Sequence, residues 1–217
     1  MRLEVILECV ADADCRVLAD IGTDHAFIPI EAIKRKLANK AIACDIARGP
    51  LEIGRRNVIK ENLTEYIELR LGDGLEPLRQ DEADTIVIAG MGGMRILKII
   101  SENHEKIGNA NLILQPQHDT SKLRRGLFDL GMEICSEHLS LEAEKFYEIL
   151  IARKTKVLMT LSEENFFLGS HKGELAKLFY LQKKRKFEKY IHCISNENEK
   201  QQAYKEFVWL DKCLGQL

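Results

Sequence analysis

Three aspartates follow three successive apolar runs in this chain of 217 residues, each where a strand would end. They are Asp20, Asp45 and Asp73. The carboxyl ends of neighbouring parallel strands meet at one edge of a sheet, so these side chains are expected to face one crevice. Carboxylates accept hydrogen bonds from ammonium groups, ribose hydroxyls and exocyclic amines. The three together predict a ligand such as S-adenosylmethionine, although each alone could be a turn residue or a helix cap.

The turn after the first of these runs, residues 20–26, argues against a phosphate-bearing ligand. It holds one glycine, Gly22, whereas a dinucleotide fingerprint needs three so that the backbone can reach a pyrophosphate. The carboxylates of Asp20 and Asp24 would also repel a phosphate. A dehydrogenase is therefore disfavoured. His25 is a candidate for a contact with the cofactor, with a structural hydrogen bond as the alternative.

A glycine-rich turn follows the fourth apolar run. Three of its four positions from residue 90 are Gly90, Gly92 and Gly93, and Ala89 and Met91 complete the segment. Glycine at this density allows positive φ or a close approach of a ligand to the backbone. We expect this segment to form a wall of the ligand pocket, with a bare turn as the alternative.

The fifth apolar run ends in Gln115, Pro116 and Gln117. Pro116 stiffens the chain, and the two amides are expected to face the same crevice. Amides can hydrogen-bond the edge of a base without adding charge. An ordinary loop is the alternative.

Apolar runs of strand length alternate with segments of helical period up to about residue 154, which predicts an α/β fold with a Rossmann-like parallel sheet covered by helices on both faces. Only a short acidic bend, residues 141–144, separates the last two strands, so they should form an antiparallel hairpin. The expected strands are 16–21, 41–46, 67–71, 85–90, 111–115, 132–138 and 146–153. The expected helices are 26–38, 48–62, 93–103 and 120–130.

The composition changes after Lys156. Apolar residues at helical spacing predict two amphipathic helices that break near Ser195 and Asn196 and form a helical hairpin. We therefore expect two domains, 1–156 and 157–217. The second contains a basic run that is either a solvated helix face or a patch for phosphates. The run consists of Lys183, Lys184, Arg185 and Lys186.

The charge differs between the two parts of the chain. The total of 32 basic and 34 acidic side chains gives a net charge of −2, which taken alone would argue against a nucleic-acid partner. Residues 1–150 carry 19 basic and 26 acidic side chains, whereas residues 151–217 carry 13 and 8. The scattered cysteines and histidines lack metal-ligand spacing, so no metal is expected. No apolar run is long enough to span a membrane, and a cytoplasmic protein with reduced thiols is expected.

Six motifs resemble, in order and spacing, the bacterial tRNA adenine-22 N1-methyltransferases. The resemblance covers about residues 1–155 and implies a class I methyltransferase sheet of strand order 3-2-1-4-5-7-6 with the last strand antiparallel. It also implies S-adenosylmethionine as the methyl donor and a C-terminal coiled-coil-like helical domain that helps to hold tRNA. The motifs are Asp20–Ala26, Arg48–Pro50, Leu71–Leu75, Ile88–Gly93, Leu112–Pro116 and Lys145–Glu148.

The resemblance also implies site residues. By matching position, the methionine part of the cofactor would lie along Gly22, Asp24 and His25, the ribose at Asp45, the adenine at Asp73 and Gly74, and the sulfonium and target base beside Gly90, Met91, Gly92 and Gly93. Asp45 stands where the family usually has glutamate, and Gln117 where it usually has asparagine. Neither change removes a functional group.

Methyl transfer to N1 of adenine uses a lone pair that is free at neutral pH, so positioning should dominate catalysis. The product is cationic, and Asp24 is the candidate for stabilising that charge, with Gln115 orienting the base and Gly90 beside the reacting atoms. Two rival functions remain open: a methyltransferase for another RNA or a small molecule, and a non-catalytic nucleotide-binding or RNA-binding module. A monomer is favoured.

Overall fold

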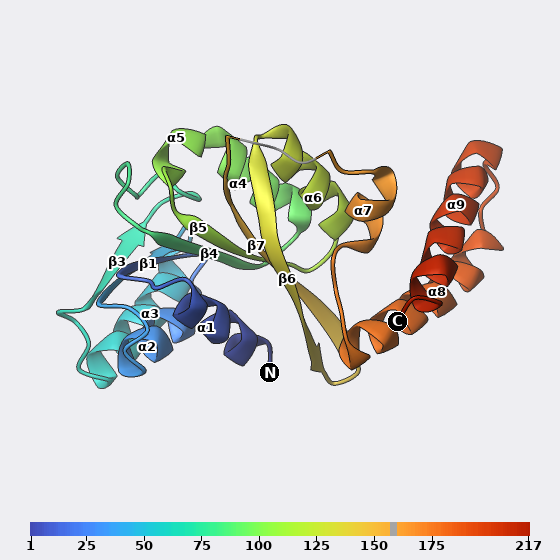
Figure 1. Cartoon of the computed structure of the whole chain (residues 1–217). Helices are drawn as coiled ribbons and strands as arrows, with labels where there is room; N and C mark the ends of the chain where they lie inside the picture. The colour runs from blue at the N-terminus through green and yellow to red at the C-terminus, as the bar shows by residue number, and fades with distance from the viewer. Residues whose placement is uncertain (157–159) are drawn as a thin grey trace. The chain divides into compact units, whose positions relative to one another are not determined.

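The computed structural model describes residues 1–156 and 160–217, in two compact units, Met1–Met159 and Thr160–Leu217. The first unit contains a seven-stranded sheet of order β3-β2-β1-β4-β5-β7-β6 (Figure 1). This order and the antiparallel β7 confirm the predicted fold class. The strands are β1 (Val17–Ile21), β2 (Lys40–Asp45), β3 (Ile67–Leu71), β4 (Thr85–Met91), β5 (Asn111–Pro116), β6 (Met132–Glu142) and β7 (Lys145–Lys154).

The central strands contain continuous apolar runs, residues 17–19, 86–89 and 112–114, because both faces of the sheet are covered. Leu18, Val87 and Ile113 belong to one core cluster, and Ala19 and Ile86 belong to the other, as the alternation of side chains along a strand requires. Helices α1 to α3 supply the first cluster and α4 to α6 the second, on opposite faces of the sheet (Figure 1). The packing of these two clusters fixes the positions of the strand ends, where the predicted site residues lie.

The helices of this unit agree with the predicted ones in part. Helix α1 was not predicted, although Ile6, Leu7 and Val10 give it a buried face. Helix α2 ends before the predicted residue 38 because Lys36 has φ of 59°, a left-handed conformation that a helix cannot include. The helices are α1 (Arg2–Asp12), α2 (Phe27–Lys34), α3 (Arg48–Lys60), α4 (Gly93–Glu102), α5 (His104–Ile107) and α6 (Thr120–Asp129).

The hairpin of β6 and β7 is longer than predicted. Glu142 pairs with Lys145, so the turn consists of two residues, Ala143 and Glu144, with φ of 44° and 67°. Two consecutive positive φ values are typical of the type I′ turn, whose twist matches that of the flanking strands. The first two residues of the acidic bend expected over 141–144 therefore belong to β6, and the last two form the turn.

The second unit contains α7 (Glu163–Leu168), α8 (Glu174–Ile191) and α9 (Glu197–Leu214). The predicted break near Asn196 is observed, and the Asn196 side chain caps α9 by accepting hydrogen bonds from the backbone of Asn198 and Glu199. Helix α7 was not predicted. It is joined to α8 by the Tyr180 hydroxyl, which donates to the Leu168 carbonyl at 3.1 Å. The expected domain boundary falls at residue 157, which lies outside the described residues.

Within the described ranges 1–156 and 160–217, no helix is both long enough and apolar enough to cross a membrane.

Candidate active site

The turn between β1 and α2 is held in an unusual backbone conformation. Gly22, Asp24 and Ala26 have φ of 74°, 48° and 59°. The N–H groups of Gly22 and Thr23 donate to the Cys44 carbonyl at 2.8 and 2.9 Å, which fixes the turn against the end of β2. The left-handed φ of Gly22 favours glycine, and a Cβ atom there would also displace the end of the Met91 side chain. Non-glycine residues at positive φ cost free energy and cluster at functional sites.

Two cavities adjoin this turn at the carboxyl ends of the strands, and Gly22 lines both. The larger has a volume of about 400 Å³ and lies between the turn, α1 and the end of β4. The smaller has a volume of about 180 Å³. The larger cavity is lined by Arg2, Gly22, Asp24, Phe27, Ala89 and Gly90, among others. The smaller is lined by Gly22, Asp45, Asp73, Gly74, Met91 and Arg95, among others.

Asp20 lies behind the turn and lines neither cavity. Its side chain is buried and accepts a hydrogen bond from the Thr23 hydroxyl at 2.6 Å. Burial raises the pKa of Asp20 to about 7, with the charge of Asp45 adding to the increase and the bond from Thr23 opposing it. The geometry gives Asp20 a position from which it orients Thr23, and a direct contact with a ligand stays a prediction.

Asp45 and Asp24 are joined across the turn. The Asp45 carboxylate accepts hydrogen bonds from the backbone N–H of Ala47 at 2.8 Å and of Asp24 at 3.4 Å. The Asp24 carboxylate is 65% exposed, and its Oδ2 lies 3.5 Å from Nε2 of His25. The His25 carbonyl accepts a hydrogen bond from Asn57 at 3.0 Å, which ties this residue to α3. Asp24 is thus the carboxylate of the turn that remains open to a ligand.

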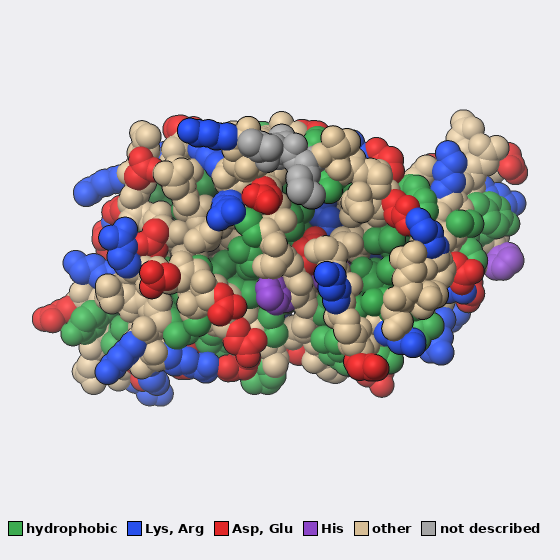
Figure 2. Space-filling view, viewed as in Figure 1, with side chains coloured by type: hydrophobic (Ala, Val, Ile, Leu, Met, Phe, Trp, Pro, Cys, Tyr) green, Lys and Arg blue, Asp and Glu red, His purple; other side chains and the backbone are tan. Residues whose placement is uncertain are grey.

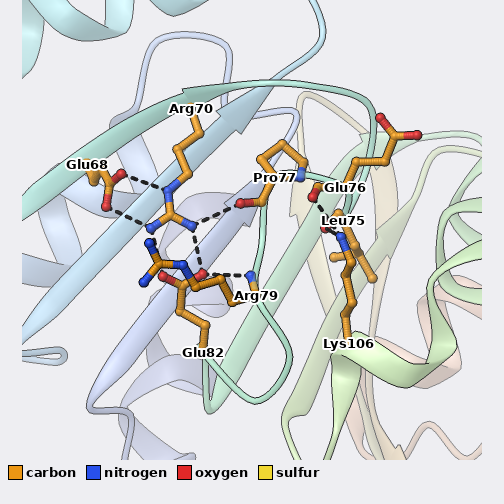
Figure 3. Close-up of polar contacts among 8 residues, drawn as sticks. All are labelled: Glu68, Arg70, Leu75, Glu76, Pro77, Arg79, Glu82 and Lys106. Carbon is orange, nitrogen blue, oxygen red and sulfur yellow. Dashed lines mark hydrogen bonds and ion pairs between the residues drawn. The ribbon is translucent and has the colours of Figure 1, made fainter.

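Asp73 belongs to the loop after β3, which two basic residues hold in place (Figure 3). Arg70 donates to the carboxylates of Glu68 and Glu82, with all four distances between 2.7 and 2.8 Å, and to the Pro77 carbonyl at 3.0 Å. These bonds lower the pKa of Glu82 to about 2. Five bonds are the full donor capacity of a guanidinium group.

The second basic residue, Lys106, donates to the carbonyls of Leu75 and Glu76 at 3.3 and 2.7 Å (Figure 3). Together Arg70 and Lys106 fix the segment that contains Asp73 and Gly74. Asp73 itself pairs with Arg95 at 3.4 Å, and Gly74 has φ of 52°. Burial raises the pKa of the Cys44 thiol to about 12, so this residue gives the smaller cavity a neutral wall.

The glycine-rich turn after β4 divides into two parts. Gly90 and Met91 each line a cavity, as predicted for a pocket wall. Gly92 and Gly93 instead allow close packing. A Cβ at Gly92 would lie 2.6 Å from the His118 ring, and one at Gly93 would lie 2.7 Å from the Asp119 carbonyl oxygen.

Gln115 is fully buried, although the sequence predicted that its amide faces the crevice. Its Oε1 accepts hydrogen bonds from the Gly90 N–H at 3.2 Å and from Arg2 Nη1 at 3.4 Å, and its Nε2 donates to the Pro116 carbonyl at 2.7 Å. Gln117 is partly exposed and accepts from Lys145 Nζ at 3.1 Å. The amide of Gln115 is therefore positioned to support Gly90, and contact of either amide with a base stays a prediction.

The basic run on α8 is partly engaged within its own unit. Lys183 donates to the Phe167 carbonyl at 2.7 Å, Lys184 pairs with Asp211, and Lys186 donates to Gln182 at 3.2 Å. Arg185 is exposed. On the face of the first unit seen in Figure 2, acidic and basic side chains are interspersed.

Four further residues of the site were not predicted from the sequence: Arg2, Phe27, Arg70 and Arg95. The helical spacing of Ile6, Leu7 and Val10 could have revealed α1 and with it Arg2. No group of three or more His, Cys, Asp or Glu side chains in the described ranges could hold a metal ion.

The sheet order, the turn after β1 and the carboxylates at the ends of β2 and β3 define a class I S-adenosylmethionine-dependent methyltransferase fold. Residues 18–212 match the model of one family, tRNA (adenine(22)-N(1))-methyltransferase. The chain therefore belongs to this family.

Individual relatives support this membership. The tRNA (adenine(22)-N(1))-methyltransferase of Bacillus subtilis is 39% identical over 152 residues, which are 70% of this chain and 63% of that protein. The alignment thus spans less than two thirds of the relative's length. A Streptococcus pneumoniae structure, assigned as a tRNA (m1A22) methyltransferase and solved with S-adenosyl-L-methionine, is 32% identical with a TM-score of 0.88 and covers 98% of both chains. M. capricolum TrmK, solved with S-adenosyl-homocysteine, is 27% identical with a TM-score of 0.86 and covers 99% of this chain and 97% of its own.

Proposed function

We propose that this chain transfers the methyl group of S-adenosylmethionine to N1 of adenine 22 in the D-loop of tRNA. The observation that carries the proposal is the pair of cavities that share Gly22 at the carboxyl ends of the strands, in a chain that belongs to this enzyme family. One cavity suits the nucleoside part of the donor, and the other suits the methionine part and an incoming base.

The residues of the smaller cavity fit the donor's nucleoside. Asp45 accepts from the ribose hydroxyls, Asp73 accepts from the adenine amine, and Gly74 leaves room for the ring. Gly22, Asp24 and His25 bind the methionine part from the side of the larger cavity. Bound in this way, S-adenosylmethionine supplies a methyl group on a positively charged sulfur.

The chain's own residues act by positioning. The adenine leaves its helical stack to enter the larger cavity, and Gly90 presents its backbone beside the reacting atoms. Attack by the N1 lone pair forms the new C–N bond as the S–CH₃ bond breaks, so no proton has to be removed in that step. The exposed carboxylate of Asp24 stabilises the positive charge that develops on the ring.

The chain has two domains, a methyltransferase domain of residues 1–156 and a helical domain of residues 157–217. The helical domain contributes to tRNA binding through its basic run. The chain acts as a cytoplasmic monomer. Sedimentation of the purified protein with and without tRNA tests the oligomeric state.

A methylation assay on unmodified tRNA, with mapping of the modified nucleotide, tests the function. We expect one methyl group at N1 of A22, and none in a tRNA in which A22 is replaced by G. Modification at another position, or of a small molecule in place of tRNA, would overturn the proposal.

A further inference from the structure

We propose that Arg2 and Lys145 form a phosphate clamp at the mouth of the larger cavity and hold the backbone of the tRNA strand that carries the target base. This inference rests on the proposed function and extends it to the substrate side of the same site. It assigns a binding role to the start of α1 and to the start of β7.

The two cations lie against one aromatic ring. The Cζ atom of Arg2 is 5.0 Å from the centroid of the Tyr147 ring, and Nζ of Lys145 is 4.8 Å from it. The cations are therefore at most about 10 Å apart, which is comparable to the screening length at physiological salt. Each also donates to a glutamine, Arg2 to Gln115 in β5 and Lys145 to Gln117 directly after β5.

This arrangement favours an anion. Two like charges held near one ring repel each other, and a phosphate that contacts both would offset that repulsion with two attractions. A guanidinium group has five donors and binds phosphate through two of them, while an ammonium group has three donors. Among the described residues, the side chains of Arg2 and Lys145 each donate one hydrogen bond, so each retains donors for a phosphate.

One carboxylate belongs to the same cluster. Glu142 accepts a hydrogen bond from the backbone N–H of Arg2 and pairs with Lys145 in the hairpin register. It stabilises the N-terminus of α1, where a negative charge is favourable. Arg2, Lys145 and Glu142 together carry one net positive charge, and Asp24 lines the same cavity as Arg2.

The position of Arg2 relates the clamp to the substrate. Arg2 lines the larger cavity together with Asp24 and Gly90, where the target base would enter. A base that is flipped out of its stack brings its flanking phosphates to the rim of the pocket. Lys145 lies on the β6–β7 hairpin and does not line the cavity. The clamp therefore has Arg2 at the rim of the cavity and Lys145 outside it.

Salt-dependent tRNA binding tests the clamp. Arg2→Gln and Lys145→Gln should each weaken binding at low salt and reduce the slope of log Kd against log salt by about one. Arg2→Lys should keep the slope because the charge remains. The matched controls Arg16→Gln and Lys98→Gln remove cations whose side chains are 79% and 69% exposed elsewhere in the unit, and both should bind as the unaltered chain does.

The donor's carboxylate is the other anion with this chemistry, and a second pair of measurements separates it from phosphate. Arg2→Gln should bind S-adenosylhomocysteine and 5′-methylthioadenosine, which lacks the carboxylate, with unchanged affinity. A selective loss of S-adenosylhomocysteine affinity with an unchanged salt slope would overturn the clamp, as would unchanged slopes in both glutamine variants.

The clamp and the proposed function can fail separately. If the unaltered chain methylates A22 but the variants keep its salt slope, only the clamp fails. If the slopes fall as expected but A22 is not methylated, only the proposed function fails. Absence of tRNA binding by the unaltered chain would overturn both.

Discussion

The backbone N–H of Gly90 donates to Oε1 of the buried Gln115 at 3.2 Å. This bond connects the glycine-rich turn after β4 to the end of β5. Gly90 has φ of 80°, and the bond fixes that conformation at the wall of the larger cavity. The side chain of Gln115 thus acts on the cavity through the backbone of another residue.

Gln115→Leu should impair turnover more than cofactor binding. The substitution leaves the Gly90 N–H without its acceptor, and because Gly90 is exposed the cost in the free energy of unfolding should be about 0.5–1.5 kcal/mol. We expect kcat to fall by roughly tenfold because Gly90 loses its fixed position. Chemical denaturation and single-turnover methylation measure the two effects. Gln80→Leu, which changes an exposed glutamine elsewhere in the unit, is the control, and equal effects of the two substitutions would contradict the role of Gln115.

Asp24→Asn should lower kcat by roughly 10–100-fold, because it removes a charge that stabilises the cationic product. Asparagine tolerates the positive φ of this position, and the side chain is 65% exposed, so folding should be unaffected. The control is Asp14→Asn, which changes an exposed aspartate with φ of 49° elsewhere in the unit. A normal rate with normal affinity for S-adenosylhomocysteine would refute the assignment.

Asp20 should make stability depend on pH. In the unfolded chain its carboxyl ionises near 3.8, and in the folded chain near 7. Between these values the folded chain keeps a proton that the unfolded chain releases, so the free energy of unfolding falls as pH rises, by up to about 4 kcal/mol.

Asp20→Asn should therefore flatten the pH profile of stability between pH 4 and 7, as measured by urea denaturation. Asp129→Asn, which changes an exposed aspartate at the end of α6, should keep the slope of the unaltered chain. A profile for Asp20→Asn that retains the full slope would show that Asp20 is ionised in the folded chain.

Arg70→Lys should weaken cofactor binding without a matching loss of kcat at saturating donor. Lysine has three donors and no planar fork, so it cannot hold Glu68, Glu82 and the loop carbonyl together. We expect the Kd for S-adenosylhomocysteine to rise by roughly 3–10-fold, because Asp73 and Gly74 then also adopt positions that do not bind the cofactor. Calorimetry measures the change. Arg55→Lys, at an exposed ion pair with Glu52, should have no effect, and a parallel loss in both variants would contradict the role of Arg70.

The sheet was predictable because its central strands contain continuous apolar runs. Burial on both faces leaves a continuous run such as residues 85–89 in the sequence, and the carboxylates at strand ends follow from the same pattern. The end of α2 was not predictable, because a lysine gives no indication that its backbone is left-handed, as that of Lys36 is.

The roles within the site were less predictable than its location. A glutamine at the end of a strand can face a ligand or the interior, and only the packing of α1 against the sheet decides that Gln115 is buried. Asp20 likewise precedes a turn of polar residues, yet the fold encloses its side chain. Arg70 was missed because its partners lie on both sides of it in the chain and meet only when the loop after β3 closes.

The shared wall at Gly22 separates two parts of the molecule that can change independently. The smaller cavity is lined largely by residues at and after the ends of strands, whereas the larger cavity is also lined by Leu3 and Ile6 of α1, which lies outside the sheet. Substitutions in α1 would therefore change the cavity for the acceptor base and the methionine part of the donor, while the cavity for the nucleoside stays intact. The acceptor side of the site can thus vary without a change in the sheet.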